Sequence, residues 1–128
     1  MNRIGLLVTL ATLAMAAGCA KKQAAQDNLV TVPAGTPAAA NVTLLAREGD
    51  VGRSGPISNG YRPQLKFSDK PEEISCKISM PSGTGEIAPG QRLDVSIVCD
   101  GEIKAKADQL GFDMLEGGRK VGTGMLHR

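Results

Sequence analysis

The feature that most constrains the fold is an alternation of apolar and polar side chains in several short segments. Residues 74–80 place an apolar side chain at every second position, residues 93–99 do the same apart from Val98, and residues 103–107 and 110–114 continue the pattern. A period of two is typical of β-strands that bury one face and expose the other. Turn sequences separate the segments: Pro81-Ser82-Gly83, Pro89-Gly90, Asp100-Gly101 and Gly117-Gly118. About six or seven such strands predict a small all-β barrel or sandwich.

The N-terminal residues 1–18 have the organisation of an export signal. Arg3 precedes an uncharged apolar run, residues 4–17, which is too short to cross a bilayer core of about 30 Å as a permanent helix. The run ends in small residues directly before Cys19, and this arrangement resembles the lipobox of bacterial lipoproteins. The resemblance implies cleavage before Cys19, which then carries lipid such as palmitate and holds the chain at a membrane. An ordinary secretory signal followed by a chance cysteine is the alternative.

Residues 19–41 follow the signal and are rich in alanine, with few large apolar side chains. Such a segment buries too little apolar surface to offset the entropy of ordering it, so we expect a flexible, lipidated tether. The compact domain is expected at residues 42–128. Ala20, not Asp, follows the cysteine, and this resembles the outer-membrane address of such lipoproteins. We therefore expect a bacterial cell-envelope protein that is lipid-anchored in the outer membrane and faces the periplasm.

Composition and missing motifs argue against several classes of function. The chain has 15 Lys+Arg against 13 Asp+Glu, one Tyr, two Phe and no Trp, which favours neither an electrostatic nor a stacking interaction with nucleic acid. The sequence contains no Gly-x-x-x-x-Gly-Lys-Ser/Thr loop for nucleotide phosphates and no Gly-x-Ser-x-Gly nucleophile motif. Its one His and three Cys do not have the spacing of a metal site. We expect no enzymatic activity, no cofactor, no metal and no bound nucleotide.

Two motifs resemble a known family. Residues 60–64 (GYRPQ) and 116–124 (EGGRKVGTG) are similar to segments of the C-terminal β-barrel domain of bacterial elongation factor Tu, in the same order and with matching spacing. Residues 44–49 fit the first strand and turn of that domain. The resemblance covers nearly all of residues 42–128 and implies an antiparallel Greek-key barrel of about six or seven strands. The GTPase domain and the middle barrel of the factor have no counterpart here, so we expect neither GTPase nor translation activity.

The two motifs also supply candidate partner-binding residues. In the family, the Glu and the first Gly of the hairpin contact aminoacyl-tRNA, and they match Glu116 and Gly117. Structural roles are the alternative, because Gly117-Gly118 suits a tight hairpin turn and Tyr61 can pack on the barrel with its hydroxyl on a polar group. The functional interpretation is an exposed edge that a partner protein contacts. The candidates are Tyr61, Arg62, Gln64, Glu116, Gly117, Arg119 and Lys120.

An anchor, a tether and a neutral barrel without catalytic motifs predict a lipid-anchored envelope module that contacts another protein. In one specific form, the barrel engages a molecule that recognises elongation factor Tu. One alternative is nucleic-acid contact through residues 116–120, which predicts salt-sensitive binding. Others are an accessory structural lipoprotein without a specific ligand, and an enzyme that acts on an envelope polymer with perturbed carboxylates.

Cys76 and Cys99 lie on the apolar faces of two predicted strands. If these strands pair as a hairpin with the two cysteines opposite each other, the turn is centred between Ile87 and Ala88, inside the turn-rich loop 81–90. The oxidising envelope then favours a disulfide. The alternatives are two buried free thiols, or two strands in opposite walls of the barrel.

Overall fold

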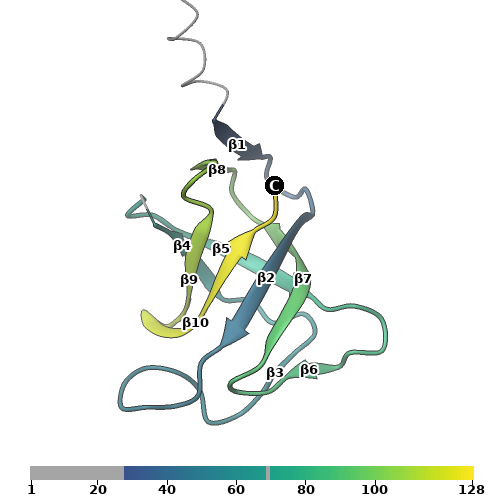
Figure 1. The fold of residues 1–128 in the computed structure, drawn as a ribbon, viewed down its shortest axis with the longest axis vertical. Coiled ribbons are helices and arrows are strands. Elements are labelled where there is room, and N and C mark those ends of the chain that lie inside the picture. The colour runs from purple at the N-terminus through teal and green to yellow at the C-terminus, as the bar shows by residue number, and fades with distance from the viewer. Residues whose placement is uncertain (1–27, 69) are drawn as a thin grey trace, which may run out of the picture.

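The computed structural model describes residues 28–68 and 70–128, and the regular elements among them are all β-strands (Figure 1). Burial along the longer strands alternates residue by residue, as the sequence pattern predicts. The strands are β1 (Leu29–Val32), β2 (Ala38–Leu44), β3 (Ile57–Ser58), β4 (Gln64–Phe67), β5 (Glu73–Ser79), β6 (Glu86–Ile87), β7 (Arg92–Cys99), β8 (Ile103–Lys106), β9 (Gly111–Glu116) and β10 (Arg119–Leu126).

Six of these strands close into a barrel in the order β10-β2-β7-β5-β4-β9. All six pairs of neighbouring strands in the wall are antiparallel. The strands β4, β5 and β7 are neighbours around the barrel, and β2 lies on the far side of β7, which is the arrangement of a Greek key. The predicted all-β antiparallel Greek-key barrel is therefore confirmed, with six strands in its wall. Two short pairs, β1–β8 and β3–β6, lie outside the wall.

Apolar side chains from the inward faces of the strands fill the barrel. The side chains of Leu65 and Met114 lie opposite each other on β4 and β9, and both are fully buried. Phe67 and Phe112 form the next inward pair on these strands, with ring centroids 5.4 Å apart and planes inclined at 56°. Such a tilted arrangement is favourable for two aromatic rings. The β1–β8 pair lies across one end of the barrel (Figure 1), where its apolar side chains join the core.

Two glycines of β10 make room for large side chains of β9. Gly122 lies opposite Met114, and Gly124 lies opposite Phe112. A Cβ atom at Gly124 would collide with the Phe112 ring, and one at Gly122 would collide with the end of the Met114 side chain and with a carbonyl group of β2. The Gly-x-Gly spacing at the end of the 116–124 motif therefore has a packing role inside the barrel.

The structure corrects the predicted boundary between tether and domain. Ordered strands begin at Leu29, and the barrel wall begins at Ala38 instead of Val42. Alanine is not a spacer here, because Ala40 is fully buried and its strand pairs with β7 on one side and β10 on the other. The predicted flexible tether is thus wrong for residues 29–41. Residues 1–27, which include the predicted signal peptide and Cys19, lie outside the described residues.

The part of the chain that the structure describes contains no helix of sufficient length and apolar character to span a membrane.

Candidate functional site

The β9–β10 turn and the loop between β2 and β3 lie near the end of the barrel that is remote from β1 (Figure 1). β9 ends at Glu116, β10 begins at Arg119, and these two residues are opposite each other in register. The connecting Gly117 and Gly118 have φ of 59° and 82°. Positive φ at both central residues is the requirement of a type I′ two-residue turn, which glycine meets without strain. The structural role expected for the Gly-Gly pair is therefore present.

The loop at residues 45–56 packs against the start of β10 through its backbone. The amide of Leu45 donates to the carbonyl of Val121 at 3.0 Å, and the amide of Gly52 donates to the carbonyl of Lys120 at 2.9 Å. A hydrogen bond from the amide of Arg53 to the carbonyl of Leu45, at 2.9 Å, closes the loop on itself. These bonds bring the side chain of Arg53 to the end of β9.

Three side chains meet at that point and tie the loop to the hairpin. The Arg53 guanidinium lies 2.6 Å from Oε2 of Glu116, and the Tyr61 hydroxyl donates to the same oxygen at 3.1 Å. The guanidinium also lies 5.4 Å from the centre of the Tyr61 ring, within range of a cation–π interaction. We call Arg53, Tyr61 and Glu116 the latch. The two predicted candidates Tyr61 and Glu116 are thus in direct contact.

The latch perturbs the ionisation of its members. Partial burial raises the pKa of Tyr61 to about 12, and the neighbouring Glu116 carboxylate contributes in the same direction. Burial alone also raises the pKa of Glu116, but hydrogen bonds from Arg53 and Tyr61 outweigh it and hold the pKa below the ordinary value. The hydrogen bond to Glu116 raises the pKa of Arg53. At neutral pH the latch is therefore an ion pair with a neutral phenol beside it.

The remaining hairpin candidates line a shallow depression next to the latch. Its volume is about 480 Å³. The Lys120 ammonium lies 3.2 Å from a carboxylate oxygen of Asp113, and Nε of Arg119 is buried without a hydrogen-bond partner among the described residues. We call the depression and the latch together the hairpin surface. The depression is lined by Asp50, Gly117, Gly118, Arg119 and Lys120.

Two predicted candidates lie elsewhere. The Arg62 guanidinium contacts the carboxylate of Asp100, on the turn after β7, at 3.2 and 3.4 Å. Gln64 lies in the barrel wall, where it pairs with Ser75 of β5 and Leu115 of β9. Tyr61, Arg62 and Gln64 therefore do not form one binding edge, and only Tyr61 belongs to the hairpin surface.

Sequence reasoning missed Arg53 and Asp50. The available signal was the glycine pattern around Arg53, with Gly52 before it and Gly55 two residues after it, which marks a tightly folded loop. The partner of Arg53 lies 63 residues away in the chain, and local sequence does not reveal contacts of that separation.

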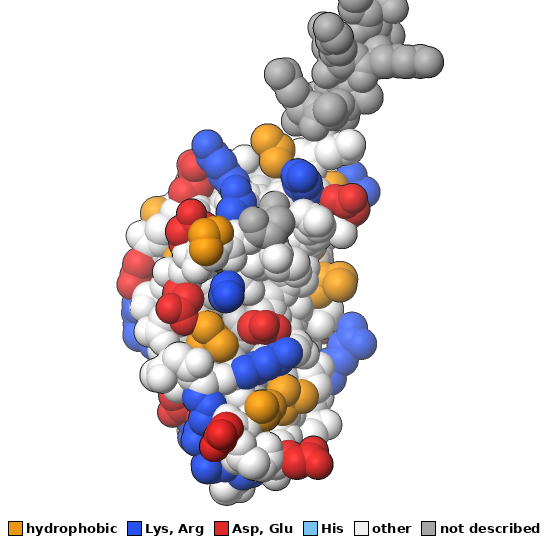
Figure 2. All heavy atoms as spheres, turned by 90° about the vertical axis from the view of Figure 1, so that its left-hand side faces the viewer, with side chains coloured by type: hydrophobic (Ala, Val, Ile, Leu, Met, Phe, Trp, Pro, Cys, Tyr) orange, Lys and Arg blue, Asp and Glu red, His pale blue; other side chains and the backbone are white. Residues whose placement is uncertain are grey.

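The charges around the hairpin are mixed in sign. Arg53 faces Glu116, and Lys120 faces Asp113. Over the face of the molecule that Figure 2 shows, basic and acidic side chains are interspersed and hydrophobic ones occur singly. Among the described residues, no group of three or more His, Cys, Asp or Glu side chains is arranged to hold a metal ion.

Cys76 and Cys99 lie opposite each other on β5 and β7, in the register that the sequence predicts. They form a disulfide, with Cα atoms 3.9 Å apart, and both side chains are buried in the barrel. The two alternatives, buried free thiols and strands in opposite walls, are therefore wrong. The disulfide joins two adjacent strands of the wall and closes the chain segment between them, which includes the loop 81–90.

No protein-family profile matches this chain.

Proposed function

We propose that this chain is a lipid-anchored binding module of the bacterial cell envelope that contacts another protein. The lipobox-like sequence before Cys19 supports the anchor. The Cys76–Cys99 disulfide supports export, because disulfides persist in oxidising compartments such as the periplasm and are rare in the cytosol. Ala20 after the cysteine supports the outer membrane as the site of anchorage, with the barrel in the periplasm. The proposal includes no catalytic step, no cofactor and no nucleotide.

The observation that carries this proposal is the position of the hairpin surface relative to the entry of the chain. The described chain begins at Asn28, next to β1, and β1 lies at the opposite end of the barrel from the 45–56 loop (Figure 1). A barrel held to a membrane through its N-terminus therefore presents the hairpin surface away from that membrane. A partner in the periplasm reaches this surface without competing with lipid.

We also infer that the barrel is related to the C-terminal domain of elongation factor Tu, and that the partner is a molecule that recognises that domain. The roles of the motif residues support this relationship. Tyr61 and Glu116, one from each motif, are in contact, while Gly122 and Gly124 create the space for β9 side chains. This contact between the two motifs and the packing role of the glycines support the proposed relationship.

Protein is favoured over nucleic acid as the partner because the cations of the hairpin surface have acidic neighbours. Arg53 is paired with Glu116, and Lys120 is paired with Asp113. Binding to a phosphate backbone depends on several unpaired cations that displace counterions. Arg119 alone does not supply that number. An accessory structural role, without a specific ligand, is the outcome if the test below finds no partner.

Site-specific photo-crosslinking in intact cells tests the proposal. A photoreactive residue replaces Lys120 in the hairpin surface, and a matched variant carries it at Lys77, an exposed position on the outer face of β5. We expect a discrete protein adduct from position 120 and none from position 77. Equal adducts at both positions, or none at position 120, contradict a specific hairpin surface.

A second variant distinguishes the latch from the rest of the barrel. Glu116→Ala removes the acceptor of both Arg53 and Tyr61, so the 45–56 loop loses its side-chain attachment to the hairpin. We expect the position-120 adduct to diminish in this background while the barrel stays folded. If nuclease treatment removes the cross-linked adduct and protease treatment does not, the partner is a nucleic acid and the protein-binding proposal is wrong.

A further inference from the structure

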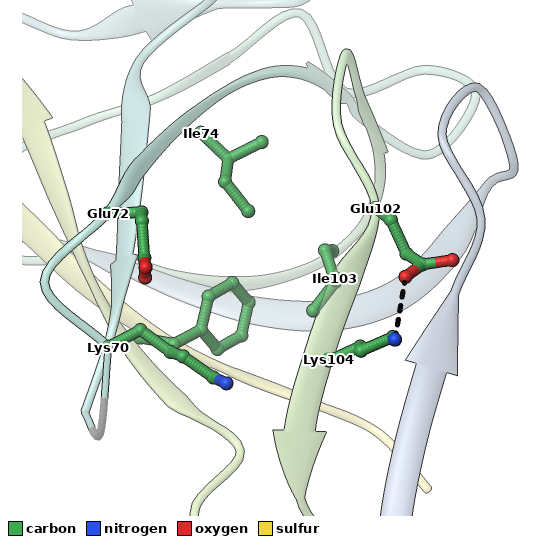
Figure 3. A pocket seen from close by; sticks show the side chains of 7 residues that line it. Lys70, Glu72, Ile74, Glu102, Ile103 and Lys104 are labelled. Atoms are coloured by element: carbon green, nitrogen blue, oxygen red, sulfur yellow. Dashed lines mark ion pairs between the residues drawn. The ribbon is translucent and has the colours of Figure 1, made fainter.

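A pocket opens near the β1–β8 end of the barrel, well apart from the hairpin surface. It lies between the turn that connects β4 to β5 and the strand β8, and its volume is about 280 Å³ (Figure 3). This volume is just under the range of about 300–1,000 Å³ that is typical of sites for drug-sized ligands. The pocket therefore suits a small metabolite. It is lined by Phe67, Lys70, Glu72, Ile74, Glu102, Ile103 and Lys104.

The floor of the pocket is apolar and belongs to the core. Phe67 and Ile103 are almost fully buried, and Ile74 is partly buried against them. The Phe67 ring is held by its contact with Phe112 inside the barrel. A floor fixed by core packing and by strand pairing is preformed, so a ligand does not have to order it on binding.

The rim of the pocket carries charges of both signs. Lys70 and Glu72 project from the β4–β5 turn on one side, while Glu102, directly before β8, and Lys104 of β8 lie on the other (Figure 3). Nζ of Lys104 lies 3.4 Å from a carboxylate oxygen of Glu102, so these two charges satisfy each other. Within residues 28–68 and 70–128, Lys70 and Glu72 do not take part in an ion pair.

We propose that this pocket binds a free amino acid with an aliphatic side chain, such as leucine. The side chain rests on Phe67, Ile74 and Ile103, the carboxylate faces Lys70, and the ammonium faces Glu72. A zwitterion matches a rim that offers one cation and one anion, whereas a singly charged amphiphile leaves one of them without a counter-charge. This proposal is independent of the partner-binding function of the hairpin surface.

Isoleucine methyl spectra of the full chain in detergent micelles, titrated with L-leucine, test this site. We expect binding in about the millimolar range, as for other small, shallow sites. The methyl signals of Ile74 and Ile103 shift, while those of Ile57 and Ile87 do not, because the latter pair on β3 and β6 outside the pocket. Methyl signals that do not move, or that all move alike, overturn the proposal.

Charge variants test the assignment of the rim. Lys70→Ala and Glu72→Ala each weaken leucine binding about 1.5-fold to fivefold, the range for solvent-accessible ion pairs. Lys66→Ala and Glu73→Ala are the matched controls, because these residues lie opposite each other on the outer faces of β4 and β5 and do not line the pocket. The controls bind leucine as the parent does. Equal affinity in all four variants overturns the assignment.

Ligand analogues test the chemical class independently of any variant. Glycine lacks the side chain, 3-methylbutylamine lacks the carboxylate, and 4-methylpentanoate lacks the ammonium group. We expect each analogue to shift the Ile74 and Ile103 methyl signals less than leucine does at the same concentration. An analogue with one charge that binds as tightly as leucine overturns the zwitterion assignment.

Discussion

Reduction of the Cys76–Cys99 disulfide is the most direct test of what stabilises the barrel. The cysteines are 23 residues apart in sequence. In the chain-entropy model, a loop of this length removes about 11 cal/mol/K from the unfolded chain, which is about 3 kcal/mol at 25 °C. For a domain of about 100 residues, this difference lowers Tm by about 12–24 °C. The reduced protein is the cleanest perturbation because its buried side chains keep their volume.

The assay is urea unfolding of the purified protein with and without reductant. Reduction lowers the urea midpoint, and it raises the m-value, because the unfolded chain without the cross-link exposes more surface. Ile97→Val is the control, because Ile97 is fully buried and lies on β7, where β7 pairs with β5. This substitution lowers the free energy of unfolding by about 0.5–1.5 kcal/mol through the native state, so the variant has the same m-value as the parent.

Two results refute the reasoning. One is a decrease in the free energy of unfolding of less than about 1 kcal/mol on reduction, well under the value from the chain-entropy model. The other is a decrease in the free energy of unfolding of the full expected size with an unchanged m-value. In that case the disulfide acts through contacts in the native state and not through the unfolded chain. The variant with both cysteines replaced by alanine is expected to lose more than the reduced protein does, because it adds a cavity at two buried positions.

Three further predictions concern the anchor, the latch and the packing of β10. Cys19→Ser releases the barrel from the membrane fraction or stalls processing of the precursor; full retention with unchanged acyl labelling contradicts the lipid anchor. Because the pKa of Glu116 is lowered on folding, its contribution to stability is complete above its ordinary pKa of 4.5 and is lost as pH falls through the lower folded value. Glu116→Gln therefore flattens the acid side of the stability profile measured by thermal unfolding, and an unchanged profile refutes the role of the latch. Gly124→Ala places a Cβ against the Phe112 ring and destabilises the barrel by about 1–3 kcal/mol, whereas Gly111→Ala, with only ordinary contacts, changes little in the same denaturation assay.

Local pattern was sufficient to predict the strands at residues 74–80, 93–99, 103–107 and 110–114 and to suggest one long-range pairing. The alternation at residues 74–80 and 93–99 fixes which side chains face inward, and the turn sequences between them leave few registers. These two constraints make Cys76 and Cys99 opposite each other if the strands pair as neighbours, and the structure shows that they do. The hairpin turn at Gly117-Gly118 has the same origin, since two adjacent glycines tolerate the positive φ of a two-residue connection.

The parts that escaped prediction depend on neighbours that are distant in sequence. The alanines of β2 have weak intrinsic preference for a strand, and their place in the wall is decided by hydrogen bonds to β7 and β10. β1 is a strand only because β8 pairs with it. Arg53 belongs to the latch because its loop folds back on β10. The pocket beneath Lys70 likewise combines a turn with a strand that begins about thirty residues later.

The pairing of β1 with β8 has a mechanical consequence for a barrel that is held at its N-terminus. Tension on the chain first loads β1, which has a single hydrogen-bonded neighbour, whereas β2 is bonded on both sides within the closed wall. β1 is therefore the strand that separates first when the chain is pulled from its N-terminal side. If β1 separates from β8, residues 29–37 become free chain that spans at most about 30 Å while the wall stays intact. The short strand would thus give a barrel anchored at its N-terminus a reserve of chain length that is released without unfolding of the wall.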